Sequence, residues 1–160
     1  APEYCFIKLF KGMKNLEYIT GDLISPWADV KMDVHDIPMN DNTFDVVICN
    51  HVLEHVNDSH KVMTEFYRVM KPGGWGIFQV PIDTNNPITE EDKSVTNPKE
   101  RERLYWQDDH LRLFGLDYGK KLAAAGFKVT ESNFINELSP ELVERYALPK
   151  GEIVYFCEKV

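Results

Sequence analysis

The sequence predicts an α/β fold: an open, mostly parallel β-sheet with helices on both faces and an antiparallel last strand. Apolar runs of strand length alternate with amphipathic helical stretches, as in sheets covered by helices. The run Phe44–Asn50 (FDVVICN) is typical of a strand covered on both faces. The length of 160 residues fits one domain. We therefore expect residues 1–160 to form a single domain.

Helices are predicted from apolar periodicity and from residues that favour helix ends. Residues 4–10 place apolar side chains on one helical face, and Gly12 or Asn15 can end that helix. Asn57 or Asp58 can cap a helix over about residues 59–70, and Gly126 ends one over about 116–125. Ser139, followed by proline and glutamate, begins another helix.

Strands and connections complete the prediction. Strands are expected at residues 16–20, 29–32, 44–50, 75–81, 127–134 and 152–159. The sequence from Lys71 to Gly74 (KPGG) turns the chain into one of these strands. Residues 82–112 are expected to form a lid or substrate loop, since long polar connections usually serve binding. Within them, residues 99–103 (KERER) indicate a solvated helix face.

The composition excludes several classes of partner. The formal net charge is −8 with no basic block, so a broad nucleic-acid surface is not expected. No apolar run is long enough to span a membrane, and we expect no signal peptide. Cys5, Cys49 and Cys157 lie far apart, which favours free, mostly buried thiols in a reducing, cytoplasmic compartment.

Two aspartates follow successive predicted strands. Ligands of open α/β sheets bind beyond the carboxyl ends of the strands, where Asp22 and Asp33 are expected. One carboxylate can accept hydrogen bonds from a ribose diol and the other from an exocyclic amine, which suits an adenosine-containing ligand. The alternative, equally supported by spacing, is that both aspartates cap turns.

Histidines gather after the strand 44–50. His51, Glu54 and His55 match the H-x-x-E-H pattern of zinc peptidases, but the pattern precedes a predicted helix cap rather than lying on a helix. An active-site loop or ordinary loop packing fits better, and His51, His55 or His110 could act as general base. We expect no metal among the site residues.

Glu54, Trp106 and Arg112 are candidates for substrate contact. Arg112 could bind an acidic group, and its alternative is an ion pair with Asp108 or Asp109. Trp106 could line a pocket or serve as a hydrophobic anchor.

Residues 32–75 resemble the core of S-adenosylmethionine-dependent methyltransferases with a Rossmann-like fold, of the type 11-like domain. The motifs that carry the resemblance are, in order, Asp-x-x-x-Ile-Pro, the strand ending in Asn-His, Leu-Glu-His, and Arg-Val-Met-Lys-Pro-Gly-Gly. The run from Asp109 to Phe114 and the later Ala-Gly-Phe extend the likeness to roughly residues 1–135.

The resemblance implies a binding site for S-adenosylmethionine, with S-adenosylhomocysteine as product. It implies that Asp22 binds the ribose, with Leu23 next to it, and that Asp33 accepts from the adenine amine, with Val34 beside the ring. It also implies that Asn50 lies near the methyl group that is transferred.

The sequence departs from the family at its start. The family's first strand and glycine-rich loop would precede residue 1, and only Pro2 and Glu3 resemble the tail of that loop, as cofactor contacts. We expect either a fragment of a longer protein, N-terminally truncated, or a strand replaced by rearrangement or by a partner chain. An unfilled strand position would favour a homodimer.

The predicted function is methyl transfer to an O, N or C nucleophile of a small molecule. The alternative is a non-catalytic or truncated binding module of the same fold, motivated by the missing loop. A zinc hydrolase is the remote alternative.

Overall fold

The structure is a computed structural model that describes residues 4–149 and 151–160. It divides the chain into two compact units, Ala1–Met39 and Asn40–Val160. The expectation that residues 1–160 form a single domain stays a prediction. Within the described residues, no helix has both the length and the apolar character needed to cross a membrane.

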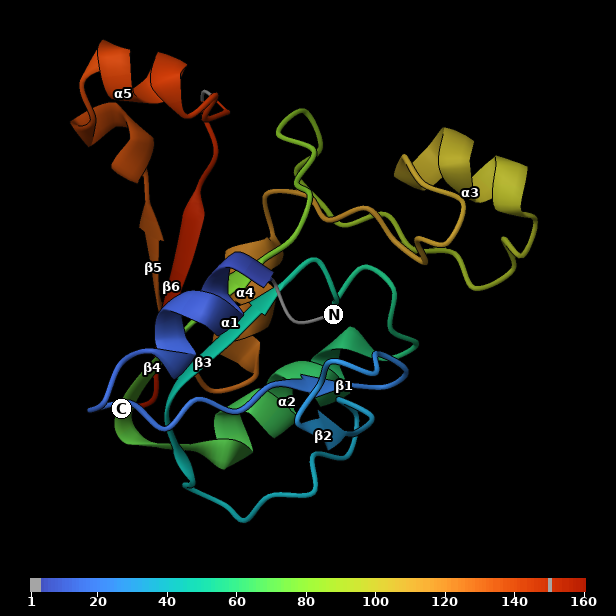
Figure 1. The fold of residues 1–160 in the computed structure, drawn as a ribbon. Helices are drawn as coiled ribbons and strands as arrows, with labels where there is room; N and C mark the ends of the chain where they lie inside the picture. Colours follow the sequence, from blue (N-terminus) through green and yellow to red (C-terminus); the bar gives the residue numbers. More distant parts are fainter. Residues whose placement is uncertain (1–3, 150) are drawn as a thin grey trace. The chain divides into compact units, whose positions relative to one another are not determined.

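The first unit contains one helix and a pair of short parallel strands (Figure 1). Helix α1 (Tyr4–Lys11) is followed by β1 (Gly21–Asp22) and β2 (Val30–Lys31). The predicted strand at 16–20 is wrong in position. An apolar run becomes a strand only where its backbone finds a partner, and here Gly21 and Asp22 pair with β2.

Asp29 joins the parts of this unit. Its carboxylate accepts hydrogen bonds from Lys11 Nζ at 2.7 Å, Thr20 Oγ1 at 2.7 Å and Thr20 N at 3.0 Å. Its own backbone N–H donates to Thr20 Oγ1 at 3.0 Å. The end of α1 and the residues before β1 and β2 are thereby fixed to one another.

The second unit is built on a four-stranded sheet of order β3-β4-β6-β5. Its strands are β3 (Phe44–Asn50), β4 (Met70–Gln79), β5 (Lys128–Ser132) and β6 (Val154–Glu158). β3 and β4 are parallel, whereas β6 runs antiparallel to both β4 and β5. The predicted parallel sheet with an antiparallel last strand is confirmed.

β3 differs from its prediction in burial. It lies at the edge of this sheet, and none of its residues is fully buried. The expectation of a strand covered on both faces is therefore wrong for the described structure.

The predicted KPGG turn is a bulge inside β4. Phe44 pairs with Met70, yet Val46 pairs with Trp75, so residues 71–74 of β4 stand opposite the single residue Asp45 of β3. Gly73 has φ 79, and a Cβ on Gly74 would lie 2.8 Å from the Asp45 carbonyl oxygen. Both glycines are needed for the chain to pass this point.

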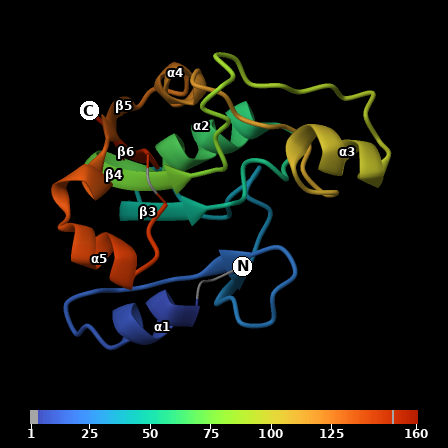
Figure 2. The same cartoon turned by 90° about the horizontal axis from the view of Figure 1, so that it is seen from above.

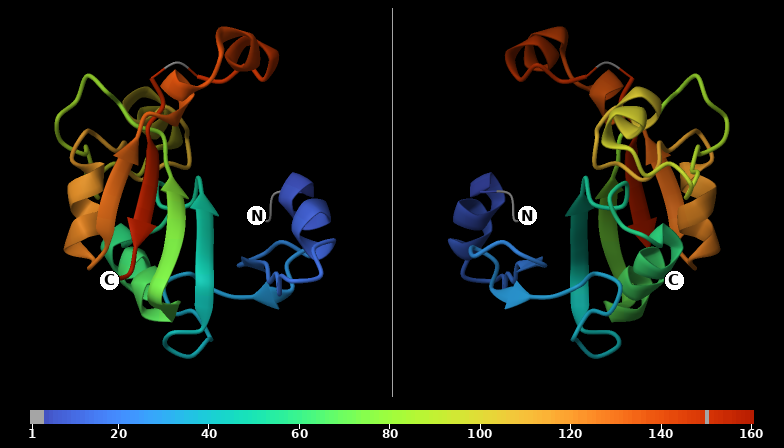
Figure 3. Two further views of the ribbon diagram at one scale, coloured as in Figure 1. Left: turned by 90° about the vertical axis from the view of Figure 1, so that its left-hand side faces the viewer. Right: turned by 90° about the vertical axis from the view of Figure 1, so that its right-hand side faces the viewer.

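Two helices cover one face of the four-stranded sheet (Figure 3). They are α2 (Ser59–Val69) and α4 (Tyr118–Ala124). Asp58 caps α2 by accepting from Lys61 N at 2.9 Å, as predicted. Gly126 follows α4 with φ 112, a conformation that glycine adopts without strain. Phe66 of α2 stacks on Phe78 of β4 at 5.1 Å between ring centroids.

Figure 2 shows the path of the segment 82–112. The segment packs around a small core that it shares with Leu113, the residue that follows it. It contains helix α3 (Pro98–Tyr105), so the predicted helix around residues 99–103 is confirmed. Val95, Tyr105 and Leu113 pack together, and Tyr105 Oη accepts a hydrogen bond from Asp92 N at 3.0 Å. After β5, a short 3-10 helix (Phe134–Glu137) and α5 (Pro140–Arg145) complete the chain before β6.

Candidate functional site

The candidate site in the second unit is the loop of residues 51–57 that follows β3. His51 N donates to the Gln79 carbonyl at 2.8 Å, which holds the start of the loop at the carboxyl ends of β3 and β4. His51 has φ 54, an uncommon backbone conformation for a residue with a side chain. The loop consists of bends and turns rather than a helix. The helical zinc-peptidase arrangement of His51, Glu54 and His55 is therefore not formed, and the hydrolase alternative is not favoured.

Arg112 holds this loop in place. Its Nη1 donates to the carbonyls of Leu53 and Val56, each at 2.6 Å, and its Nη2 donates to that of Asn57 at 3.3 Å. The remaining N–H groups bind the Glu91 carboxylate at 3.0 and 3.1 Å. All the guanidinium donors are thus used, and the side chain is 1% exposed.

Two expectations for Arg112 are therefore wrong. It does not pair with Asp108 or Asp109, and it keeps no donor for an acidic substrate. Its hydrogen-bond partners lie far away in the sequence, so the acidic residues next to it did not indicate which groups it binds. Its position makes it a structural clamp on the candidate loop.

His110 reaches the loop through a backbone contact. Leu111 N donates to the Glu54 carbonyl at 2.8 Å, which places His110 beside Glu54. The His110 Nδ1 lies 2.7 Å from the Tyr105 carbonyl oxygen. A carbonyl can only accept, so Nδ1 carries a proton. In the neutral ring Nε2 then has the lone pair. His110 is 1% exposed.

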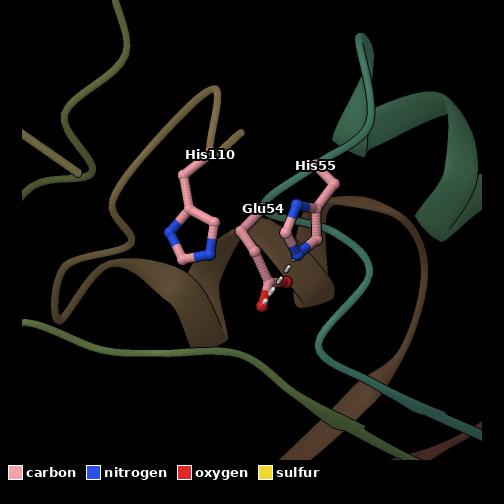
Figure 4. Close-up of side chains that lie close together, drawn as sticks. All are labelled: Glu54, His55 and His110. Carbon is pink, nitrogen blue, oxygen red and sulfur yellow. Dashed lines mark ion pairs between the residues drawn. The ribbon is translucent and has the colours of Figure 1, made fainter. Parts of the chain in front are cut away.

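Glu54, His55 and His110 form a compact cluster (Figure 4). Glu54 is 1% exposed, and neither carboxylate oxygen accepts a hydrogen bond from a described residue. Its Oε1 lies 3.4 Å from His51 Nδ1 and 4.0 Å from His55 Nε2. The rings of His55 and His110 meet edge to face at 4.8 Å between centroids. The predicted histidines thus gather around one buried carboxylate.

Asp109 completes the surroundings of His55. Its Oδ2 lies 3.2 Å from His55 Nδ1. From the sequence, Asp109 was a possible partner of Arg112 and the start of a family-like run, but its contact with His55 was not predicted. The available signal for this contact was that Asp109 precedes His110 in the sequence. The Leu111 N–Glu54 hydrogen bond that brings His110 to the loop also brings Asp109 there.

Cys49 lies near the end of β3. Burial and the nearby charge of Glu54 raise the pKa of its thiol to about 12. Burial likewise raises the pKa of Cys157 to about 12. All three cysteines are free, as predicted, but Cys5 is exposed, so its expected burial is wrong.

The cofactor candidates of the first unit lie at one edge of the β1–β2 pair. Because the strands are parallel, Asp22 at the end of β1 and Asp33 just after β2 follow strand ends of the same polarity. Asp22 Oδ1 accepts from Ile24 N at 2.8 Å and Ser25 N at 2.7 Å. Asp33 Oδ1 accepts from His35 N at 2.9 Å and lies 2.7 Å from His35 Nδ1.

Both aspartates thus make the turns that the alternative interpretation expected. Leu23, after Asp22, is 56% exposed. Val34 lies in the turn after β2. Their roles toward a cofactor stay predictions.

The remaining candidates are scattered. Asn50 is the last residue of β3 and pairs with Gln79. Trp106 ends α3 with φ 74 and is 52% exposed, so it is not the buried hydrophobic anchor; the buried aromatic residue there is Tyr105, at 2% exposed. Pro2 and Glu3 lie outside the described residues.

Residues 13–78 match the model of a family described as a methyltransferase domain. Among curated proteins, the chain is similar to the ubiquinone/menaquinone biosynthesis C-methyltransferase UbiE of Desulfotalea psychrophila, with 45% identity over 42 residues. The match covers 26% of this chain and 17% of that protein. The chain therefore matches only about a sixth of the length of this relative.

Solved structures support the fold over a longer stretch. A SAM-dependent methyltransferase from Archaeoglobus fulgidus is 16% identical with a TM-score of 0.56, covering 95% of this chain and 79% of that one. The 1,6-didemethyltoxoflavin-N1-methyltransferase of Burkholderia thailandensis, solved with bound 1,6-didemethyltoxoflavin and S-adenosylhomocysteine, is 14% identical with a TM-score of 0.57. That match covers 88% of this chain and 60% of that chain.

The chain has the Rossmann-like fold of S-adenosylmethionine-dependent methyltransferases. Its segment 13–78 carries the methyltransferase domain pattern. The family resemblance stated from the sequence is thereby confirmed.

Proposed function

We propose that the protein transfers the methyl group of S-adenosylmethionine to an O, N or C nucleophile of a small molecule. The observation that carries the proposal is the family match over residues 13–78, which includes Asp22, Asp33 and Asn50. Asp22 and Asn50 end strands and Asp33 follows one, and ligands of this fold bind beyond the carboxyl ends of its strands. Residues 1–160 then act as a single methyltransferase-like domain.

The aspartates fit the polar groups of the cofactor. In this proposal Asp22 accepts from the ribose hydroxyls, with Leu23 next to it, and Asp33 accepts from the adenine amine. Val34 contacts the adenine ring and Asn50 lies near the methionine part. The parallel pairing of β1 and β2 supports this assignment because it places both carboxylates beyond strand ends of the same polarity. Pro2 and Glu3 are proposed as further contacts.

The cofactor supplies an electrophilic methyl on a positively charged sulfur, so the protein mainly positions donor and acceptor. An acceptor hydroxyl or amine also needs a proton acceptor. His51 is the most accessible candidate, since its side chain is 61% exposed beside the buried Glu54 carboxylate. His55 and His110 are further candidates for this role.

The segment 82–112 is proposed as the acceptor-binding lid, with Glu54 and Trp106 as further acceptor contacts. A small-molecule acceptor is supported by the bound ligand in the Burkholderia thailandensis structure and by the net charge of −8, which disfavours nucleic acid. A homodimer and a cytoplasmic location complete the proposal. The binding-module alternative would retain cofactor binding without turnover.

The test is a calorimetric titration of the whole chain with S-adenosylhomocysteine. We expect saturable binding that Asp33→Ala weakens about 10- to 100-fold, the cost of losing one hydrogen bond to a charged group. The matched control is Asp92→Ala, because Asp92 Oδ1 makes the same kind of turn by accepting from Ser94 N at 2.8 Å. Absence of binding, or equal losses in both variants, would contradict the proposed cofactor site.

A further inference from the structure

We infer that Glu54, His55 and His110 form a binding site for a divalent transition-metal ion of the zinc type. One ligand atom from each residue lies within 4.8 Å of the others. Two imidazoles and one carboxylate are a ligand set that such ions prefer. The site differs from the H-x-x-E-H pattern, because His110 rather than His51 supplies the second imidazole.

The histidines are already oriented as metal ligands. His110 Nδ1–H donates to the Tyr105 carbonyl at 2.7 Å, and His55 Nδ1 lies 3.2 Å from Asp109 Oδ2. The His110 contact places a proton on Nδ1, so that the neutral ring offers its Nε2 lone pair to a metal. The Asp109 carboxylate favours the same tautomer of His55. Figure 4 shows that the ring nitrogen of His110 farther from its backbone, Nε2, faces Glu54. A carbonyl or carboxylate behind a ligating imidazole is the usual support of protein metal sites.

The carboxylate gives the second, independent observation. Glu54 is 1% exposed, and neither oxygen accepts a hydrogen bond from any residue in the ranges 4–149 and 151–160. Burying a carboxylate is costly unless a cation or hydrogen-bond donors compensate its charge. The Nε2 of His55 is 4.0 Å from Oε1, too long for a hydrogen bond. This distance fits two ligand atoms of a single ion, which would bring them closer together.

The surroundings allow an ion to enter and to keep an open position. His55 is one-third exposed, at 33%, and His51 is 61% exposed, so the cluster reaches solvent on this side. The protein supplies three ligands at most from this group, which leaves room for water or for an oxygen atom of a ligand. A backbone hydrogen bond from Leu111 N to the Glu54 carbonyl, at 2.8 Å, keeps Glu54 and His110 next to each other.

The test is zinc binding by the whole, metal-free chain at neutral pH. Cys5 is exposed and is replaced in all variants by Cys5→Ser, so that it cannot bind zinc. We expect calorimetry to give one zinc ion per chain, and cobalt to give the visible absorption of a bound ion. His55→Gln should weaken binding at least 100-fold, and Asp109→Asn about 10- to 100-fold, as a lost supporting contact does.

The matched control is His60→Gln, an exposed histidine at the start of α2, which should leave zinc affinity unchanged. Circular dichroism without metal verifies folding. Glu54→Gln adds a second readout: it should keep the metal-free fold while abolishing the rise in Tm that zinc causes in the parent protein. Equal zinc affinity in the parent, His55→Gln and His110→Gln, or no zinc binding by the parent, would overturn the inference.

Discussion

At the scale of single residues, Arg112 determines the shape of the candidate loop. Its guanidinium spans from Glu91 in the segment 82–112 to carbonyls of the loop after β3. Backbone carbonyls that lack a strand or helix partner must find another donor when buried, and Arg112 supplies it. The buried Glu54 beside these carbonyls depends on the same loop conformation.

Arg112→Met is expected to lower the free energy of unfolding by about 3–5 kcal/mol, because it leaves buried acceptors without donors. Urea unfolding followed by circular dichroism measures this. Arg103→Met is the control: Arg103 is 70% exposed and lies 3.9 Å from Glu100, so its loss should change stability by no more than about 0.5 kcal/mol. A loss below about 1 kcal/mol for Arg112→Met would show that the clamp is not needed.

The sequence predicted the candidates around Glu54 but not their arrangement. Adjacent residues such as Glu54 and His55 are visible as a motif, and their place after a strand could be predicted from the apolar run before them. His110 and Asp109 join them through one backbone hydrogen bond between distant segments. No local periodicity encodes such a contact, so the ligand-like orientation of His55 and His110 required the structure.

At the scale of secondary structure, long patterns were predicted better than short ones. The strand Phe44–Asn50 was predicted at its observed bounds, and α2 (Ser59–Val69) to within one residue, with its Asp58 cap. In each of these segments many apolar side chains follow the pattern of one type of secondary structure, a strand or a helix. β1 has two residues, and its position depends on pairing with β2 rather than on its own composition. The predicted strand at 16–20 failed for this reason.

Asp29 gives a pH prediction for the first unit. Hydrogen bonds from Lys11 and Thr20 lower its pKa from 3.8 to about 2. A carboxyl whose pKa is lower in the folded state stabilises that state above its unfolded pKa, and this contribution is lost as the pH falls toward 2. A ¹³C NMR titration of the Asp29 carboxyl should therefore give a midpoint near 2.

Lys11→Met should move that midpoint toward 3.8, because it removes the 2.7 Å contact between Lys11 Nζ and Asp29. Lys14→Met changes the net charge equally and serves as control. A midpoint near 3.8 in the unmodified protein would contradict the hydrogen-bond network around Asp29.

At the scale of the whole molecule, the two groups of candidate site residues lie in different units of the chain. The four-stranded sheet of the second unit carries the histidine cluster, and the β1–β2 pair of the first unit carries the two aspartates. The alternation of strands and helices was enough to predict the mostly parallel sheet and its antiparallel last strand. The family pattern over residues 13–78 includes residues of both units: the two aspartates, Glu54 and His55, but not His110.

Backbone NMR of the ¹⁵N-labelled chain, titrated with S-adenosylhomocysteine, tests the proposed cofactor site most directly because it reports on both units at once. We expect chemical-shift changes concentrated at residues 22–23, 33–34 and 50–51, with the helix α5 unaffected. Saturating shifts at those positions would support a methyltransferase cofactor site formed as proposed. Shifts absent at excess ligand, or confined to residues away from the ends of β1, β2 and β3, would contradict it.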